Sequence, residues 1–444
     1  MTQTSGGKLD AVVRRLPLFS LVGFVLMSIV AGVIATVFYD PARTPHPGAD
    51  GPRWLDGLFQ NDSGWYSLIA KDGYSYTPGQ QSPIAFFPAY PLVLRVVGLA
   101  IGRDYVTAAG LVTLVSGAGV VMLFAAWVRT RVQPLTALVA VGILMLYPYS
   151  FFLYGTGYAE STYLLTVLGA FALLERRLYL PAAIVGAMAT GGRPVGVAVT
   201  VGLVVRAIEL LAQDRAARRA DPVLVESGVG ASSAVAASGG RVLTAEAPAP
   251  GIATPTYPDT PRGAVPLREL IHAVRFARWR EVSLLGSLGG LVAWMIYLQV
   301  RFGDPVAFAT VQEAPGWDQR SGPHTWFKVL FFERIARHEA HVFLLAPQIL
   351  ATLLAVLLLR LTWKRFGWGY LAYSVVSLAI PIIGTKDFMG SGRYVMSAFP
   401  VLAAAAIFLT DRRRPKWLAP AVLIVSFFGL CIITAKFVTG LEVS

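Results

Sequence analysis

Cysteine is almost absent from this chain of 444 residues, which contains only Cys431. A single thiol excludes an intramolecular disulfide and a cysteine-rich metal site. Charged residues are also scarce at 14%, whereas 55% of the residues are hydrophobic and the mean hydropathy is +0.60. This composition is too apolar for a soluble globular domain, and the repeated long apolar runs predict an all-α polytopic membrane protein.

Acidic residues are few as well, with 25 of them against 38 basic residues, which gives a net charge of +13. The basic residues form short clusters at the ends of apolar runs, and this is the pattern of cytoplasmic loops in membrane proteins. The charge therefore indicates contact with membrane lipids, and we expect no nucleic-acid partner.

Six basic clusters fall on one side of the membrane if the chain makes roughly 11 spans. The clusters are Arg14/Arg15, Arg129/Arg131, Arg176/Arg177, Arg215–Arg219 with Arg275–Arg280, Lys364/Arg365 and Arg412–Lys416. The spans are expected near residues 16–38, 104–128, 134–154, 159–175, 178–192, 195–212, 282–300, 343–362, 367–384, 393–410 and 417–437. The first run is longer than the core of a signal peptide, so we expect it to remain as a helix.

Residues 85–103, AFFPAYPLVLRVVGLAIGR, are apolar but make a poor isolated span because they contain Pro88, Pro91 and Arg95. We expect a re-entrant or interfacial hairpin here. The alternative, a crossing helix, would shift the topology of everything that follows.

The chain divides into two predicted membrane modules. Residues 1–212 form the N-terminal module with an external loop at 39–103, and residues 282–444 form the C-terminal module with an external loop at 301–342. Residues 213–281 between them are expected to be a cytoplasmic, largely disordered linker, because their middle is rich in Ala, Ser, Gly, Pro and Val without a period. A short basic surface helix is expected from Arg268 to Trp279.

Most of the unusual polar residues then gather on the extracytoplasmic face. Asp62 precedes a predicted amphipathic helix over Ser63–Lys71 in the first external loop. On spacing alone its carboxylate is a helix cap, because Asp accepts from the free backbone amides at a helix start. The alternative is chemistry at the membrane surface beside aromatic rings. Asp56 and Asp72 are weaker candidates that fit solvated loop acids.

Further charged candidates stand at the predicted external ends of helices. Glu160 and Arg193 are either functional intramembrane charges or a structural ion pair. A second polar group follows near the C-terminal spans, with the members Lys386, Asp387, Arg393 and Tyr394. Within it Arg393 is the better phosphate candidate, because its planar guanidinium matches oxyanions.

Histidines gather in the second external loop as His324, His338 and His341. Without a carboxylate motif such as HExxH they favour interfacial or hydrogen-bonded roles over a metal site. No nucleotide-binding glycine loop stands out, so we expect neither a metal nor a cofactor.

Several separated blocks are similar to the PIG-V family, the GPI mannosyltransferase II-like enzymes with bacterial relatives among the multispanning GT-C glycosyltransferases. The blocks are NDSGWYSLIAKDGY (61–74), AFFPAYP (85–91), YAES (158–161), GGRPVG (191–196), FGDPVAF (302–308) with Gln312 and Trp317, and SGRYVMSAFP (391–400). They run in the family's order over most of the chain except 213–280. Eukaryotic members usually have a tryptophan directly before the aspartate, where this chain has Asn61.

The resemblance implies a GT-C-like helix bundle whose first extracytoplasmic loop carries short amphipathic helices. It further implies transfer of a mannose from a polyprenyl-phosphate donor to a lipid-linked or glycolipid acceptor on the extracytoplasmic face. Asp62 is the position that matches the acidic residue regarded as catalytic in such enzymes.

This chemistry is physically coherent with the residues present. A polyprenyl phosphate leaves as a stabilised anion, so the reaction needs a base and cations but no general acid. Asp62 would be the base, with inversion at the anomeric carbon, and Arg393, Arg193 or Arg95 would hold the phosphate. Trp65, Tyr66 and Tyr74 would stack on the sugar or define the lipid entrance, unless they are an interfacial aromatic belt. The remaining substrate-binding candidates are Glu160, Tyr394, Lys386, Asp387 and Gln312.

A secondary transporter or lipid flippase is the main alternative, and it predicts inverted repeats and broken helices near the membrane midplane. The polar residues gather at the outer surface instead, which favours an enzyme. A scaffold protein would leave the external acids unexplained. The residues leave open a pentose donor and a protein acceptor. Usage rich in alanine, valine and arginine but poor in lysine fits a GC-rich bacterial genome, so a bacterial plasma membrane and a cell-envelope glycolipid acceptor are expected.

Overall fold

A computed structural model describes residues 13–42, 51–220, 265–319, 322–339 and 342–443, and all regular structure within these ranges is helical. The long helices are α2 (Leu16–Phe38), α6 (Tyr105–Val128), α10 (Val197–Ala220), α18 (Val342–Phe366) and α22 (Leu418–Val438). Helices of intermediate length are α4 (Asp62–Asp72), α5 (Ala89–Ala100), α7 (Pro134–Leu146), α8 (Glu160–Glu175), α9 (Tyr179–Thr190), α14 (Gly289–Phe302), α19 (Trp368–Gly384) and α21 (Phe399–Leu409).

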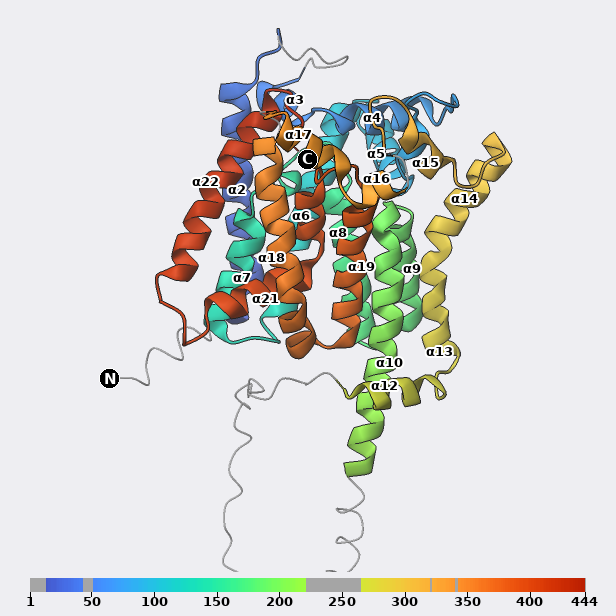
Figure 1. Ribbon diagram of the computed structural model, residues 1–444, viewed down its shortest axis with the longest axis vertical. Helices are drawn as coiled ribbons and strands as arrows, with labels where there is room; N and C mark the ends of the chain where they lie inside the picture. Colours follow the sequence, from blue (N-terminus) through green and yellow to red (C-terminus); the bar gives the residue numbers. More distant parts are fainter. Residues whose placement is uncertain (1–12, 43–50, 221–264, 320–321, 340–341, 444) are drawn as a thin grey trace, which may run out of the picture.

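Short helices fill the connections at the two ends of the bundle (Figure 1). The short α-helices are α3 (Arg53–Leu58), α12 (Leu267–Val274), α13 (Trp279–Val282), α15 (Ala307–Thr310), α16 (Pro323–Trp326), α17 (Val329–Ala336) and α20 (Ser391–Ser397). The 3-10 helices are η1 (Pro83–Ala85), η2 (Ser150–Leu153), η3 (Pro194–Gly196), η4 (Ser283–Leu288) and η5 (Val311–Glu313). In Figure 1, helices α3, α4, α5, α15, α16 and α17 gather at one end, while α12 and α13 lie at the other.

Six helices in the described part of the chain are long and apolar enough to cross a membrane, or up to seven if one bent pair is a single span. These helices support an integral membrane protein, as the composition predicts. The predicted count of roughly 11 spans is not confirmed, because several predicted spans are shorter than the ~20 residues that a bilayer requires. For example, α7 ends at Leu146, two residues before Pro148, since the residue preceding a proline is disfavoured in helical geometry.

The predicted span at 393–410 is broken in the structure, which corrects the expectation of one continuous helix. Helices α20 and α21 meet at Ala398 with a bend of 81°. Pro400 lies in the first turn of α21, where its missing N–H is tolerated, but it could not continue the hydrogen-bond ladder of α20. The break leaves α20 as a separate short helix that begins with Ser391 and carries Arg393.

Part of the predicted basic surface helix is present as α12, which ends at Val274, and residues 275–278 are not helical. Helix α10 reaches Ala220, beyond the predicted start of the linker. Residues 221–264 of that linker lie outside the described residues. Helix α5, in the segment where a hairpin was expected, has 12 residues and is shorter than a span.

The connection between α21 and α22, which carries one of the basic clusters, lies toward the end of the bundle that carries α12 (Figure 1). Arg129 donates to the backbone carbonyl of Arg14 at 3.1 Å, and Arg131 pairs with Glu175 at 3.4 Å. Helices of the two predicted modules pack against one another, as α10 does against α19, α2 against α22 and α7 against α21. The boundary between the two modules stays a prediction.

A buried charge cluster fixes α10 against α19 near this basic end. Arg206 pairs with Glu175 and with Glu209, each at 2.8 Å. The Glu209 carboxylate also accepts the backbone N–H of Trp368 at 2.9 Å and so satisfies the first turn of α19. All the charges of this cluster are paired, which is the condition for keeping them inside.

Candidate active site

A cavity of about 560 Å³ opens at the end of the bundle that carries the short helices, and it is called the polar cavity below. Its lining includes Asn61, Asp62, Tyr66, Phe86, Tyr158, Arg193, Gln312, Trp317, Gln319, Arg334, Thr385, Lys386, Asp387, Arg393, Tyr394 and Glu442. These residues come from segments spread over almost the whole described chain. The predicted external segments therefore do converge around one cavity.

Asp62 is the first residue of α4, and it does not cap the helix, which corrects the simplest interpretation of its position. The N-cap is Asn61, with φ 50° and no side-chain capping bond. Asparagine is among the residues that adopt positive φ most readily. The backbone N–H of Asp62 donates to the hydroxyl of Tyr158 at 3.2 Å. Its carboxylate is thus free of a capping role and faces the cavity.

Two carboxylates and two arginines form a compact group at the cavity wall. Arg393 Nη1 lies 3.4 Å from Asp62 Oδ2 and 3.4 Å from Glu160 Oε1. Arg193 pairs with the same Glu160 oxygen. The Glu160 side chain is 1% exposed whereas that of Asp62 is 31% exposed, so Glu160 supports the group from behind and Asp62 presents its carboxylate to the cavity.

The surroundings make Asp62 a stronger base than an ordinary aspartate. Loss of solvent raises the pKa of its carboxyl, and the negative charge of Glu160 raises it further. The Arg393 guanidinium lowers the pKa through its charge and hydrogen bond, but the net direction is upward from the ordinary value.

Aromatic rings cover the side of the cavity next to α4. Tyr66 packs edge-on against Tyr90 with ring centroids 4.9 Å apart and against Phe86 at 5.1 Å. Burial raises the pKa of the Tyr66 hydroxyl well above its ordinary value, so this phenol stays neutral. Trp65 does not line the cavity. Its ring stacks on that of Phe86 with centroids 5.9 Å apart, and it lies tilted to the ring of Trp317 with centroids 6.0 Å apart.

The opposite wall is the connection from Thr385 to Met389, which the second loop holds in place. Asp387 is buried and pairs with Arg334 at 2.8 Å, while the backbone N–H of Lys386 donates to the Gln319 side chain at 2.7 Å. Buried Lys328 donates to the backbone carbonyl and hydroxyl of Thr385. Burial lowers the pKa of the Lys328 amine to about 8, so the amine still carries its charge at neutral pH.

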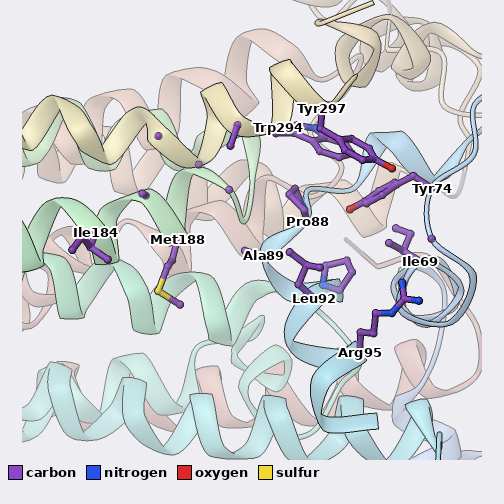
Figure 2. Close-up of a pocket in the computed structure, with 17 residues that line it drawn as sticks. Ile69, Tyr74, Pro88, Ala89, Leu92, Arg95, Ile184, Met188, Trp294 and Tyr297 are labelled. Atoms are coloured by element: carbon purple, nitrogen blue, oxygen red, sulfur yellow. The ribbon is translucent and has the colours of Figure 1, made fainter. Parts of the chain in front are cut away.

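Most of the site residues proposed from the sequence meet at the polar cavity. Its lining contains Asp62, Arg393, Arg193, Tyr394, Tyr66, Lys386, Asp387 and Gln312, with Glu160 directly behind. Arg95 and Tyr74 do not join them. They line a separate, mostly apolar cavity between α4, α5, α9 and α14 (Figure 2). Arg95 is therefore not one of the arginines that surround Asp62.

Some lining residues were not predicted as site residues. Tyr158 and Phe86 stand inside the quoted blocks YAES and AFFPAYP, so the motifs contained a signal for them. Gln319 and Arg334, which is on α17, lie outside the quoted blocks. Only their bonds to the 385–389 connection show that they belong to the site. Glu442 is far from any motif in the sequence.

The histidines considered as metal ligands do not form a centre in the described part of the chain. No group of three His, Cys, Asp or Glu side chains is placed there to hold a metal ion. His341 lies outside the described residues. The expectation of a metal-independent site stays a prediction.

No protein-family model matches the chain, and no curated protein matches it in sequence. Among solved structures, the apo oligosaccharyltransferase of Archaeoglobus fulgidus is similar with a TM-score of 0.45 at 10% identity over 96% of this chain. A second similar structure is the archaeal oligosaccharyltransferase AglB from Archaeoglobus fulgidus, in complex with an inhibitory peptide and a dolichol-phosphate. Its TM-score is 0.38 at 11% identity over 94% of this chain. This chain covers 56% of each of those two chains. Likeness of this degree assigns no function, and the resemblance to the PIG-V family is not confirmed by a sequence match.

Proposed function

We propose that the polar cavity is the active site of a membrane glycosyltransferase of the PIG-V type within the GT-C class. It moves a mannose from a polyprenyl-phosphate-mannose donor to a lipid-linked or glycolipid acceptor on the extracytoplasmic face. The observation that carries the proposal is the placement of Asp62, a partly exposed carboxylate with a raised pKa, beside Arg393 in a cavity at a membrane-protein surface. Arg193 and Glu160 complete this group.

The reaction is a single displacement at the anomeric carbon. The acceptor hydroxyl oxygen attacks that carbon while its proton passes to the Asp62 carboxylate, and the bond from carbon to phosphate oxygen breaks. The electron pair of the broken bond stays on the phosphate, so one bond forms where one is lost and the configuration inverts. A raised pKa suits Asp62 to this work, because a base is most effective when its pKa is near the working pH.

The two arginines supply the positive charge that the leaving group requires. The donor is a phosphodiester with one negative charge, and the released polyprenyl phosphate gains a second, so cations near it stabilise the transition state. The contacts of Arg393 at 3.4 Å are longer than the 2.7–3.2 Å typical of N–H···O bonds. Such long contacts can be exchanged for shorter, charge-assisted bonds to a phosphate.

Glu160 is better described as a positioning residue than as a second base. It is almost fully buried and pairs with both arginines through Oε1. A buried carboxylate that pairs with two guanidinium groups holds them close together, because it neutralises part of their mutual repulsion. The wall of Tyr66, Phe86 and Trp317 provides apolar ring surface of the kind that sugars contact.

A transporter or flippase remains the alternative, and one observation is of the kind it predicts. Helices α20 and α21 form a broken helix with a bend of 81°. However, the short helix before the break directs Arg393 toward Asp62 rather than toward an unpartnered ion site. The break thus has a role in the enzyme proposal as well.

The experiment that tests the proposal uses purified wild-type protein, radiolabelled polyprenyl-phosphate mannose and a lipid extract from bacterial membranes. We expect a labelled glycolipid that membranes lacking the protein do not produce. Arg393→Gln should raise the KM for the donor at least tenfold, because it removes a charged phosphate contact. Arg301→Gln, an exposed arginine at the end of α14, is the matched control and should leave this KM unchanged. Movement of the donor across vesicle membranes without any new glycolipid would instead establish the transporter.

A further inference from the structure

The second cavity has a volume of about 610 Å³ and is called the apolar cavity below. It lies between α4, α5, α9 and α14, and Figure 2 shows its lining side chains. The lining is Ile69, Gly73, Tyr74, Pro88, Ala89, Pro91, Leu92, Arg95, Ile184, Ala187, Met188, Gly191, Gly289, Gly290, Ala293, Trp294 and Tyr297. Arg95 is the one charged side chain among these residues.

A hydrogen-bonded strip separates the apolar cavity from the polar cavity. The backbone N–H of Ala89 donates to the carbonyl of Gly191 at 2.9 Å. On one side of this bond Phe86 and Arg193 line the polar cavity, and on the other side Ala89 and Gly191 themselves line the apolar cavity. The two cavities are therefore neighbours with distinct linings.

The apolar cavity is open to the outside of the bundle between helices with exposed apolar side chains. Leu92 is 57% exposed, Ile184 58% and Met188 48%. Helix α14, which forms the other side, belongs to the candidate span Trp279–Phe302. Large apolar side chains in this position are accessible to the hydrocarbon chains of membrane lipids, as entry of a lipid chain into the cavity requires.

Arg95 gives the cavity a charged end. Its side chain is exposed, and no ion pair joins it to another residue within the described ranges. Figure 2 shows Arg95 at one end of the cavity and Ile184 at the other, with Leu92 and Met188 between them. The hydroxyl of Tyr74 is already used, since it donates to the backbone carbonyl of Phe86 at 3.0 Å. The arrangement of one cation and an apolar path fits a molecule with an anionic head and a hydrocarbon chain.

We infer that the apolar cavity binds an anionic glycerophospholipid, with the headgroup phosphate on Arg95 and an acyl chain running along α5 and α9 toward Ile184. A guanidinium is well suited to this role because it binds phosphate oxygens in pairs. The site is separate from the polar cavity and does not depend on the reaction proposed there. The bound lipid would contact the strip of Ala89 and Gly191 that stands between the two cavities.

Quenching of tryptophan fluorescence tests this inference, because bromine atoms on a lipid chain quench an indole that they contact. The purified protein is titrated with phosphatidylglycerol brominated on its acyl chains. Trp294 lines the cavity, so Trp294→Phe should lose a component of the quenching that the wild-type protein shows. Arg95→Gln should need at least fivefold more lipid for the same quenching, and Arg95→Lys should recover most of the affinity. Lys71→Gln, an exposed cation on α4 outside the cavity lining, is the matched control and should behave like the wild type.

Brominated phosphatidylcholine has no net charge, so it should quench the fluorescence of the wild-type protein more weakly than brominated phosphatidylglycerol does. In Arg95→Gln the two brominated lipids should quench the fluorescence equally. The inference is overturned if Trp294→Phe is quenched as strongly as the wild type, or if Arg95→Gln and Lys71→Gln cannot be distinguished. It is also overturned if polyprenyl phosphate displaces the brominated lipid at lower concentration than unlabelled phosphatidylglycerol, because the cavity would then hold the chain of the donor.

Discussion

At the scale of single residues, Asp62 is the proposed base, and opposing neighbours set the pKa of its carboxyl. Burial and Glu160 raise the pKa of its carboxyl, and Arg393 lowers it. The same arginine is the proposed phosphate ligand, so phosphate binding and base strength are coupled. When a phosphate occupies Arg393, the arginine stabilises the Asp62 carboxylate less, and the base becomes stronger as the donor arrives.

The pH dependence of transfer follows from the raised pKa of Asp62. Activity requires the ionised carboxylate, so kcat/KM should fall as the pH drops through this pKa, at a pH above the ~3.9 of an ordinary aspartate. Arg393→Gln removes a group that lowers the pKa, and its acidic limb should therefore move to higher pH. The measurement is kcat/KM against pH for both proteins. An acidic limb below pH 4 in the wild type, or one that Arg393→Gln moves downward, would contradict this role for Asp62.

The residue types of the site were visible in the sequence, but their partners were not. The motif blocks contain Asp62, Glu160, Arg193 and Arg393, whereas the contact between Asp62 and Arg393 joins positions 331 residues apart. Local spacing made a helix cap the simplest role for Asp62, and tertiary placement gave the cap position to Asn61 instead. The sequence offered Arg95 as a phosphate ligand on the same footing as Arg193 and Arg393, and only the fold places it in a different cavity.

At the scale of elements, the connection between α19 and α20 depends on the second loop for its shape. Arg334, Lys328 and Gln319 each bond to a residue of this connection. The connection in turn leads into α20, which carries Arg393. The loop thus positions one wall of the polar cavity, while the carboxylate proposed as the base comes from α4.

Removal of Arg334 should destabilise the protein strongly. Arg334→Ala leaves Asp387, whose side chain is 2% exposed, without its ion-pair partner, and breaking a buried pair in this way costs about 3–5 kcal/mol. Arg337→Ala on the same helical segment is the control, because Arg337 is 70% exposed and its pair with Glu333 is a surface contact worth less than about 1 kcal/mol. Thermal unfolding in detergent measures both variants. Equal stability of the two would show that the 385–389 connection does not depend on this ion pair.

At the scale of the whole molecule, the bundle has one end with short helices and the polar cavity and another end that carries α12 and α13 (Figure 1). The basic residues in the sequence predict which end is cytoplasmic, and this orientation stays a prediction. The count of spans was less predictable. Prolines such as Pro148 and Pro400 end helices within apolar runs, and a hydropathy pattern does not reveal whether a short helix packs inside the bundle or crosses the bilayer.

The predicted orientation can be measured with single cysteines, since Cys431 is the chain's only thiol and can be replaced by serine. Single cysteines are then introduced into the Cys431→Ser protein as Gln80→Cys, in the loop after α4, and Lys416→Cys, between α21 and α22. A membrane-impermeant maleimide should label Gln80→Cys in intact cells and Lys416→Cys only after permeabilisation. The reverse pattern would place the polar cavity on the cytoplasmic side and remove the extracytoplasmic reaction.

The most direct test of the account is the comparison of two aspartates on the same helix. Asp62 begins α4 and faces the polar cavity, whereas Asp72 ends α4 and is exposed outside it. With purified proteins and radiolabelled polyprenyl-phosphate mannose, Asp62→Asn should lower kcat by about 10²–10⁴-fold, the usual contribution of a positioned base. Asp72→Asn should retain wild-type transfer. Unchanged transfer by a folded Asp62→Asn protein would contradict the account.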